Sequence, residues 1–261
     1  MSVAESRHRE YWLSKLEIPS ENSPTALIIY GTRYLGENLS RMASNFNHVK
    51  YITGRGKFLD DLFITNISGR CVAIATAYGA PMAAELVHVF CEIGVDVVIH
   101  TGSCGSLTSD LELGTVLVVS KAWSGEGVSQ YYLPKKPFFK STLSVPILAR
   151  AIKTSHLTVK TGPVFTTSAC LMESDKDKNT WRSKGCLAVD MECASVFSVC
   201  HYYHVQCAAL LWVSDLVNGQ CAAPISPIDG EELNSLKNRL LEISIEIMLN
   251  ATDNKIQISR D

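Results

Sequence analysis

Four short segments of the chain combine glycine, hydroxyl, carboxyl and basic side chains, and each lies at the predicted end of a strand. They are Gly31-Thr32-Arg33, the stretch from His100 to Gly105, Asp190-Met191-Glu192 and Ser214-Asp215. In an open α/β sheet, ligands bind where the carboxyl ends of the strands meet. These segments therefore indicate one site, whose residue types suit an anionic or sugar-containing ligand.

The glycine-rich stretch Thr101 to Gly105 reads Thr-Gly-Ser-Cys-Gly. It presents backbone N–H groups and hydroxyls without bulky side chains, so it can cradle an oxyanion such as phosphate. The alternative is a tight turn after a strand, because the stretch matches neither a Walker P-loop nor a GxGxxG fingerprint. The residues alone leave both interpretations open.

The carboxyl groups have two interpretations each. Asp190 and Glu192 stand at the start of a predicted helix, where the helix dipole favours acids and Asp190 can serve as the N-cap. Alternatively, Glu192 accepts hydrogen bonds from two vicinal sugar hydroxyls. Asp215 either holds a turn in place or acts as a general acid if burial raises its pKa. His88 and His201 are interpreted as helix-surface or packing residues.

Alternating strands and helices must position these segments, which predicts a three-layer α/β domain. Apolar runs predict strands at 25–30, 70–77, 95–99, 116–122, 157–165 and 205–213. Helical spacing predicts helices at 36–46, 83–91 with a cap at Gly94, 146–155, 175–183, 191–203 and 230–249. Residues 1–24 are a polar lead-in with a short helix near 11–16, 101–106 and 124–144 are expected to be irregular, and 251–261 to be a disordered tail.

The composition is that of an ordinary globular protein, with 46% apolar and 19% charged residues. Twenty-four basic against 26 acidic residues give a formal charge of -2, so there is no electrostatic reason to expect nucleic acid or an anionic membrane as a partner. No apolar run approaches the roughly 20 residues of a membrane span, and the polar N-terminus lacks the apolar core of a secretory signal. A cytoplasmic protein is expected.

The nine cysteines are scattered through apolar segments. None has CxxC spacing, and no cluster of cysteine and histidine shows zinc-finger intervals. They are interpreted mostly as buried thiols that act as small apolar side chains. No metal site is expected.

Taken in order, these segments resemble the superfamily of nucleoside phosphorylases and nucleosidases, which includes purine nucleoside phosphorylases, uridine phosphorylases and methylthioadenosine nucleosidases. The resemblance spans about 27–249 and rests on AVDMECAS at 188–195, TGSCG at 101–105 and LLWVSD at 210–215. The stretches 126–134 and 162–173 resemble a phosphorylase subgroup. The resemblance implies one domain over 1–261 with a twisted mixed β-sheet flanked by helices, a homo-oligomer (dimer or trimer of dimers), and cleavage of a nucleoside's N-glycosidic bond.

The resemblance also implies roles for individual residues. Glu192 would hold the ribose hydroxyls above Met191, and Asp215 would protonate the leaving base, which favours a purine. Contacts to phosphate are implied for Gly31, Arg33, Arg55, His100 and Ser103. Contacts to the base are implied for Thr167, Ser168, Asp190, Ser214 and Asp215. Nucleoside and inorganic phosphate would be the substrates, with no further cofactor.

The chain departs from the family pattern at the phosphate and base positions. His100 stands where phosphorylases usually carry arginine, Arg33 is displaced by two positions, and Ser168 and Met172 replace an aspartate and an arginine. Neutral histidine is no permanent phosphate clamp, so weak phosphate binding that falls as pH rises through about 6.5 is predicted. Phosphorolysis is favoured, and a hydrolytic nucleosidase or a specialised nucleoside-binding protein with little catalysis are the alternatives.

Overall fold

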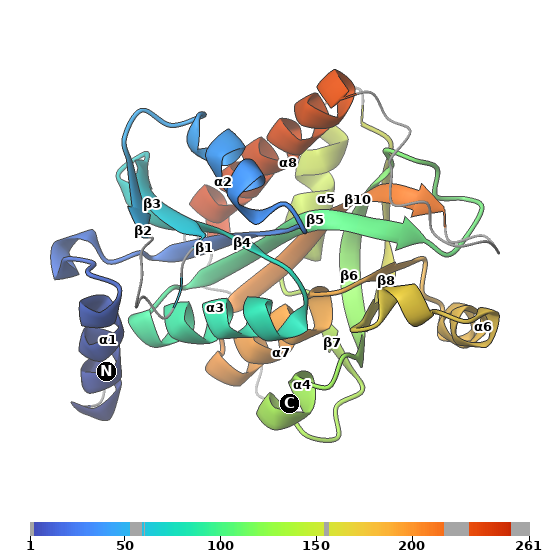
Figure 1. Cartoon of the computed structure of the whole chain (residues 1–261), viewed down its shortest axis with the longest axis horizontal. Coiled ribbons are helices and arrows are strands. Elements are labelled where there is room, and N and C mark those ends of the chain that lie inside the picture. Colours follow the sequence, from blue (N-terminus) through green and yellow to red (C-terminus); the bar gives the residue numbers. More distant parts are fainter. Residues whose placement is uncertain (1–2, 53–58, 60, 154–156, 217–229, 252–261) are drawn as a thin grey trace.

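The structure is a computed structural model that describes residues 3–52, 59, 61–153, 157–216 and 230–251. Helices cover both faces of one mixed β-sheet, so the predicted three layers are confirmed (Figure 1). The helices on the two faces are α2 (Leu35–Ala43), α5 (Ser144–Lys153) and α8 (Gly230–Ala251) on one side, and α1 (Val3–Lys15), α3 (Ala80–Ile93) and α7 (Cys193–Tyr203) on the other. The shorter α4 (Ser129–Tyr132) and the helix α6 (Asp175–Ser183) lie toward the periphery.

The sheet combines parallel and antiparallel strand pairs. They are β1 (Ala26–Gly31), β2 (Val49–Ile52), β3 (Leu62–Ile67), β4 (Arg70–Ala77), β5 (Val97–Ser106), β6 (Val116–Gly125), β7 (Phe138–Lys140), β8 (Val159–Thr167), β9 (Ala188–Asp190) and β10 (Gln206–Leu216). The order is β10-β6-β8-β9-β5-β1-β4-β3-β2, and β10 also pairs with β5. One end of the sheet therefore closes on itself, while β1 lies between its parallel neighbours β4 and β5.

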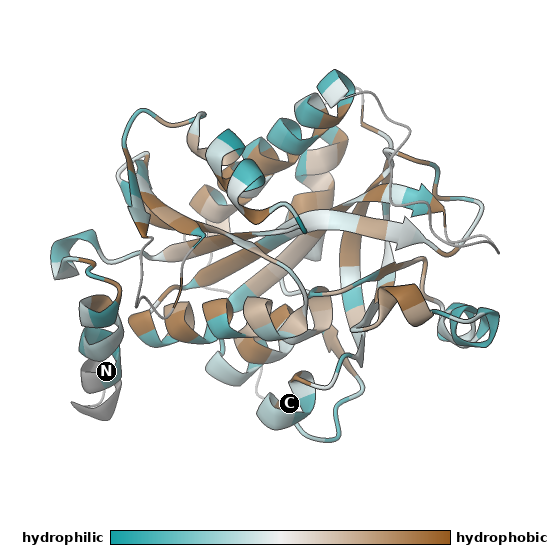
Figure 2. Ribbon diagram, viewed as in Figure 1, coloured by the Kyte–Doolittle hydropathy of each residue, from teal (hydrophilic) through white to brown (hydrophobic). Residues whose placement is uncertain are grey.

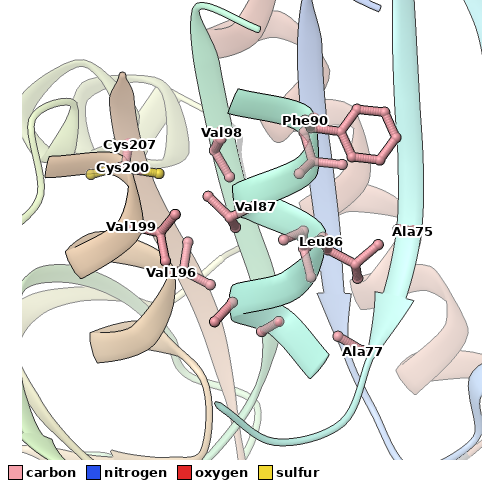
Figure 3. Close-up of a cluster of buried hydrophobic side chains, with 14 of the residues drawn as sticks. Ala75, Ala77, Leu86, Val87, Phe90, Val98, Val196, Val199, Cys200 and Cys207 are labelled. Carbon is pink, nitrogen blue, oxygen red and sulfur yellow. The ribbon is translucent and has the colours of Figure 1, made fainter. Parts of the chain in front are cut away.

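Two apolar cores hold the layers together because successive side chains of a strand point to opposite faces. Leu27 and Ile29 of β1 pack toward α3 and α7, whereas Ile28 packs toward α2 and α8. Figure 3 shows the first core, in which Val87 of α3 and Val196 of α7 meet beside β5. Apolar colour accordingly lies on the inner strands and inward helix faces, and polar colour on the outer helix faces (Figure 2). None of the described helices combines the length and the apolar character that a bilayer span requires.

Several element boundaries match the predictions. The ranges predicted for β4 and α6 are those observed, and α3 ends at Gly94, which adopts the left-handed conformation with φ of 108°. α6 begins with a capping box between Ser174 and Asp177, a local signal that fixes a helix start. All eight described cysteines are free, and six of them are buried, as expected.

Other expectations were wrong. The stretch 101–106 is no loop, because β5 continues through it, paired with β10 and, at Gly105, with β9. β10 likewise extends to Leu216. The sequence patterns did not predict β2 and β3, which pair with each other, and the polar lead-in is largely the helix α1. The stretch 124–144 contains α4 and β7. The predicted tail lies almost wholly outside the described residues.

Candidate active site

The strand ends that carry the four polar segments converge at one edge of the sheet. Gly31, the last residue of β1, pairs with Ala77 of β4 and with Gly102 of β5. Further along β5, Gly105 pairs both with Asp215 of β10 and with Val189 of β9. The sheet register therefore brings together segments that are up to 184 residues apart in sequence, from Gly31 to Asp215.

Glu192 is held beneath this edge as a buried carboxyl group. It is the N-cap residue of α7 and only 5% exposed. The backbone N–H of Gly79, just beyond β4, donates a hydrogen bond of 2.7 Å to its Oε1. A Cβ at Gly31 would lie 3.1 Å from its Oε2, a contact tighter than side chains normally tolerate. Glycine at position 31 therefore leaves the space that the carboxyl group occupies.

The pKa of Glu192 is raised to about 8 by burial and by the nearby negative charge of Asp190. The backbone N–H groups of Gly79 and Met191 and the charge of Arg33 act in the opposite direction, because they favour the ionised form. With this pKa, the Glu192 carboxyl group is mostly neutral at pH 7, and hydrogen-bond donors that approach it would favour its ionised form. Hydroxyls of a bound ligand would be such donors.

Asp190, which ends β9, is a helix cap. Its Oδ2 accepts hydrogen bonds from the N–H groups of Glu192 (3.0 Å) and Cys193 (2.6 Å), and its Oδ1 accepts one from the Thr166 hydroxyl (2.7 Å). The Thr166 oxygen in turn accepts the N–H of Ala194 at 2.9 Å. This buried network fixes the start of α7, so the geometry favours the capping interpretation of Asp190 over a contact with a base.

Arg33 forms the exposed rim above Glu192. Its guanidinium group stacks over the Tyr78 ring at 4.6 Å from the ring centroid, and its Nη2 lies 3.0 Å from the sulfur of Cys170. Because its charge also lowers the pKa of Glu192, Arg33 is close to the buried carboxyl group. It is thus an accessible cation beside Gly31, where the sequence analysis placed the phosphate.

Asp215 lies at the opposite side of the edge, near the end of β10, and is partly exposed. The Ser214 hydroxyl is 2.5 Å from its Oδ1 and 3.3 Å from the carbonyl oxygen of Cys104. A second carboxyl group, that of Glu173, is close enough to Asp215 for the two to interact electrostatically. Burial and Asp215 together raise the pKa of Glu173 to about 7, against the charge of Lys178.

The other predicted ligand-contact residues and Met172 differ in exposure. Thr167 is buried and its hydroxyl oxygen accepts the N–H of Ala169 at 3.2 Å. Ser168 is exposed and donates to the carbonyl of Glu126 at 3.1 Å. Met172 is 80% exposed, and Met191 is partly buried beside Glu192. Their predicted roles in ligand binding stay predictions.

His100 lies below the site rather than at its surface. Its side chain is fully buried, and a Cβ at Gly31 would lie 2.9 Å from its Cε1. Burial lowers its pKa to about 4, although Asp190 and the Ile29 carbonyl favour the protonated form. The predicted titration near pH 6.5 is therefore wrong, because the ring is neutral throughout the physiological range. The buried His100 side chain is therefore not placed to bind phosphate as a charged imidazole.

Of the two further phosphate candidates, only Ser103 is among the described residues. Ser103 is partly exposed on β5, and strand alternation places it on the sheet face opposite His100. The regular pairing of β5 with β10 from Val97 to Cys104 supports that alternation. Arg55 lies outside the described residues. Among the described residues, the group able to hold a metal is His100, Asp190 and Cys193.

The sequence analysis did not single out Gly79, Tyr78, Thr166 or Glu173. Gly79 follows a predicted strand, so its N–H was a candidate donor at the sheet edge. Thr166 and Glu173 both lie inside the stretch 162–173 that resembles a phosphorylase subgroup. Tyr78 carried no recognisable signal, because its place depends on the Arg33 side chain from another strand end.

Comparison with known proteins identifies relatives over most of the chain. A guanosine phosphorylase of Halorubrum lacusprofundi is 29% identical over 182 residues, which are 68% of this chain and 73% of the relative. A DeoD-type purine nucleoside phosphorylase of Myxococcus xanthus is 25% identical, covering 82% of this chain and 86% of the relative.

Solved structures share the fold. AMP nucleosidase from Bacteroides thetaiotaomicron aligns with a TM-score of 0.71 and 22% identity, covering 97% of this chain and 100% of its own. A mutant of Helicobacter pylori MTAN with 5′-methylthioadenosine in its active site aligns with a TM-score of 0.70 and 19% identity, covering 85% and 99%. At these identities the likeness concerns the fold alone.

The family model described as the phosphorylase superfamily matches residues 26–248. That range contains every strand of the sheet and all four polar segments at its edge. The resemblance inferred from AVDMECAS, TGSCG and LLWVSD is thereby confirmed: the chain belongs to the phosphorylase superfamily.

Proposed function

We propose that this protein cleaves the N-glycosidic bond of a purine nucleoside by phosphorolysis, releasing the free base and a pentose 1-phosphate. The observation that carries the proposal is Glu192, a buried carboxyl group fixed by the Gly79 N–H beside the glycine-lined edge of the sheet. Guanosine and purine nucleoside phosphorylases among the relatives are consistent with it.

The reaction passes through a ribosyl cation, so the site must hold the sugar while negative charge develops on the departing base. Glu192 accepts hydrogen bonds from the vicinal ribose hydroxyls, and their approach favours its ionised form. Met191, next to it, packs beneath the sugar. Only interactions that strengthen in the transition state accelerate the reaction, and a carboxylate next to a cationic sugar is of that kind.

The leaving base needs a proton or a hydrogen bond. Asp215 is assigned this role because it lies near the end of β10, with its carboxyl group next to the Ser214 hydroxyl. Glu173 holds a proton at neutral pH more readily than an ordinary glutamate, so it supports Asp215 as a nearby proton source. A purine offers ring nitrogens that accept such a proton.

Inorganic phosphate is proposed as the co-substrate, and no other cofactor is required for this step. Arg33 is the exposed cation beside Gly31 and Glu192. A guanidinium group stacked on a tyrosine ring keeps its five N–H donors directed to the side, where it can bind two phosphate oxygens. In this account Arg33, and not His100, supplies the positive charge for phosphate.

Hydrolysis is the second candidate, and His100 favours it. A neutral, fully buried imidazole cannot replace the permanent charge of an arginine. The phosphate site then has fewer charges than the proposed reaction would prefer. Water needs no such charge, so a nucleosidase would tolerate His100 without a penalty.

One assay separates the candidates. The protein is incubated with a panel of purine and pyrimidine nucleosides, with and without phosphate, and the sugar product is identified. Phosphorolysis predicts pentose 1-phosphate that forms only with phosphate and mostly from purines. Free pentose at the same rate in both conditions would establish hydrolysis. If no nucleoside is cleaved, the remaining candidate is a protein that binds nucleosides without catalysis.

A homo-oligomer, a dimer or a trimer of dimers, is part of the proposal. Leu171 and Met172, next to Cys170 at the rim, are 83% and 80% exposed. Apolar side chains so exposed beside a polar site are typical of an interface. Light scattering coupled to size exclusion would report the mass, and a monomer would contradict this part. The cytoplasmic location stays a prediction.

A further inference from the structure

Three side chains with different donor atoms meet under the active-site edge. They come from three elements: His100 from β5, Asp190 from the end of β9, and Cys193 from the first turn of α7. The imidazole nitrogen, carboxylate oxygen and thiol sulfur all lie within 4.8 Å of one another. All three residues are buried, with exposures of 0%, 4% and 0%. We call them the floor cluster.

The imidazole of His100 lacks a hydrogen-bond partner for either ring nitrogen. The Ile29 carbonyl is close enough to favour the protonated ring, but no bond of acceptable geometry forms. A buried polar group without a partner costs about 1–3 kcal/mol, and most native proteins satisfy such groups. The orphaned nitrogens therefore point to a missing partner in the floor cluster.

We propose that the floor cluster binds a divalent transition-metal ion, with zinc as the ion that fits best. Zinc takes histidine nitrogen, cysteine sulfur and aspartate oxygen in one tetrahedral site. Magnesium and calcium require oxygen donors throughout, and the cluster offers only one residue of that type. The donor set thus selects a borderline-soft ion.

The charges in the cluster also match a divalent ion. On binding, the Cys193 thiol loses its proton to solvent as the sulfur–metal bond forms. The resulting thiolate and the Asp190 carboxylate together balance the two positive charges, and His100 binds as the neutral ring. No oxidation or reduction takes place. A neutral site is the arrangement that burial penalises least.

The groups behind the ligands are already in place. Asp190 is oriented by the Thr166 hydroxyl and by two backbone N–H groups. The Ile29 carbonyl stands beside His100, where it can accept the second ring N–H of a metal-bound imidazole. Such outer partners normally orient the ligands of a metal site.

Cys104 lies next to the floor cluster but is not counted among its ligands, because a second thiolate would leave the site with a net negative charge. It follows His100 by four residues on β5 and so shares its sheet face. It is 3% exposed, and Asp190 and Cys193 are both close enough to interact with it electrostatically. Tetrahedral zinc separates its ligand atoms by roughly 3.5 Å, given bond lengths of about 2.0–2.3 Å. Ligand atoms that now lie up to 4.8 Å apart must therefore approach one another by up to about 1.3 Å.

A metal at this place would fix the floor of the active site without touching substrate. Asp190 accepts the backbone N–H of Glu192, and the missing Cβ of Gly31 leaves His100 and Glu192 close together. The ion would join β5, β9 and α7 directly beneath Glu192. This inference does not depend on which reaction the site performs.

The test compares wild type with Cys193→Ser, and with Cys200→Ser as the matched control. Cys200 is fully buried on the same helix, two turns further along, so its loss perturbs packing without removing a ligand. Each protein is stripped with a chelator, reconstituted and assayed for zinc by mass spectrometry, with affinity measured by competition against a chromophoric chelator. No nucleoside or phosphate is present.

The proposal predicts about one zinc per chain in wild type and in Cys200→Ser. Cys193→Ser should bind at least about 100-fold more weakly, since losing a ligand costs more than the 10–100-fold typical of an outer partner. Cobalt in the wild type should show thiolate charge-transfer absorption that Cys193→Ser lacks. If Cys193→Ser does not fold, His100→Asn provides the same comparison.

Wild-type protein that retains no zinc after reconstitution, and shows no thiolate–cobalt absorption, would overturn the proposal. So would equal zinc affinity in wild type, Cys193→Ser and His100→Asn, because the metal would then be bound elsewhere. Because these measurements involve no catalysis, they fail or succeed independently of the nucleoside assay.

Discussion

The floor and the rim of the active site are built in opposite ways. On the floor, Glu192 and Asp190 are buried and bonded to backbone N–H groups of Gly79, Cys193 and Glu192 itself. On the rim, Leu171 and Met172 are more than three-quarters exposed, at 83% and 80%. The floor is held by hydrogen bonds to the backbone, whereas the rim is made of solvent-exposed side chains.

This contrast separates two proposed tasks of the site, which are acting on the sugar and selecting the base and phosphate. Groups that act on the sugar must be oriented before the substrate arrives, and burial with backbone donors achieves that. In the proposed function, recognition of the base and phosphate would fall to accessible groups such as Arg33 and Ser168. The family's usual residues are replaced at Ser168 and Met172 on the rim, and at His100 beneath it. We expect floor substitutions to abolish turnover and rim substitutions to redirect it.

Asp215, partly exposed between the two regions, should show the largest effect. Asp215→Asn is expected to lower kcat/KM on ordinary purine nucleosides by on the order of 10²–10⁴, the usual contribution of a general acid. An N7-methylated purine nucleoside, whose base leaves without being protonated, should lose far less. Steady-state kinetics on both substrates measure the difference. Equal losses would remove Asp215 as the proton donor.

Glu192→Gln tests the floor itself. The fold should persist, because an amide can still accept the Gly79 N–H, but turnover should fall by on the order of 10²-fold through loss of a charge-assisted contact. The exposed Glu112→Gln variant serves as the control and should be unchanged. Unaltered turnover in correctly folded Glu192→Gln would contradict the assignment of the sugar site.

The same substitution predicts a pH-dependent gain in stability. With a pKa near 8 in the folded chain and about 4.3 in the unfolded chain, Glu192 binds a proton in the folded state that the unfolded state has released. The contribution of this protonated group to the free energy of unfolding is full below about pH 4 and is lost as pH rises through 8. At pH 8, Glu192→Gln should be more stable than wild type by on the order of 1–3 kcal/mol, or about 3–10 °C in Tm.

Thermal unfolding of both proteins at pH 5 and pH 8 checks this expectation. The difference in Tm should be small at the lower pH and larger at the higher one. A difference that does not change with pH would show that the buried carboxyl group titrates normally.

Met172→Ala should show the smallest effect. Because its side chain is 80% exposed within one chain, the free energy of unfolding of the dissociated chain should change by no more than about 0.5 kcal/mol, whereas a subunit interface at Met172 would be weakened. Chemical denaturation measures this change, and the nucleoside panel measures any shift in base preference. A large loss of stability would mean that the rim is packed against something, which would erase the contrast with the floor.

Much of the fold followed from local signals. β4 and α6 were predicted with their observed ends, because the apolar run of β4 and the helical pattern of α6 are local features of the sequence. Gly94 ended α3 for the same reason. β5 was cut short at 99, because its extension depends on pairing with β10, more than 100 residues away. β2 and β3 carry no clear alternation of their own.

The site was predictable where one segment holds the whole motif. AVDMECAS places Asp190 and Glu192 together, and the structure confirms that both lie at the start of α7. The burial of His100 could not be read from its neighbours in sequence, which include Gly102 and Ser103. It arises from Gly31, Asp190 and Cys193 of other elements. The sequence analysis considered only cysteine and histidine spacing, so it did not consider a cluster drawn from β5, β9 and α7.

The most direct test of the floor measures how much the sugar hydroxyls matter with and without Glu192. The ratio of kcat/KM for a ribonucleoside to that for its 2′,3′-dideoxy analogue is determined in wild type and in Glu192→Gln. If Glu192 holds the hydroxyls, the wild type should strongly prefer the ribonucleoside, and the variant should lose on the order of 10-fold to 100-fold of that preference. A ratio that stays the same in the variant, with both proteins folded, would contradict the central claim.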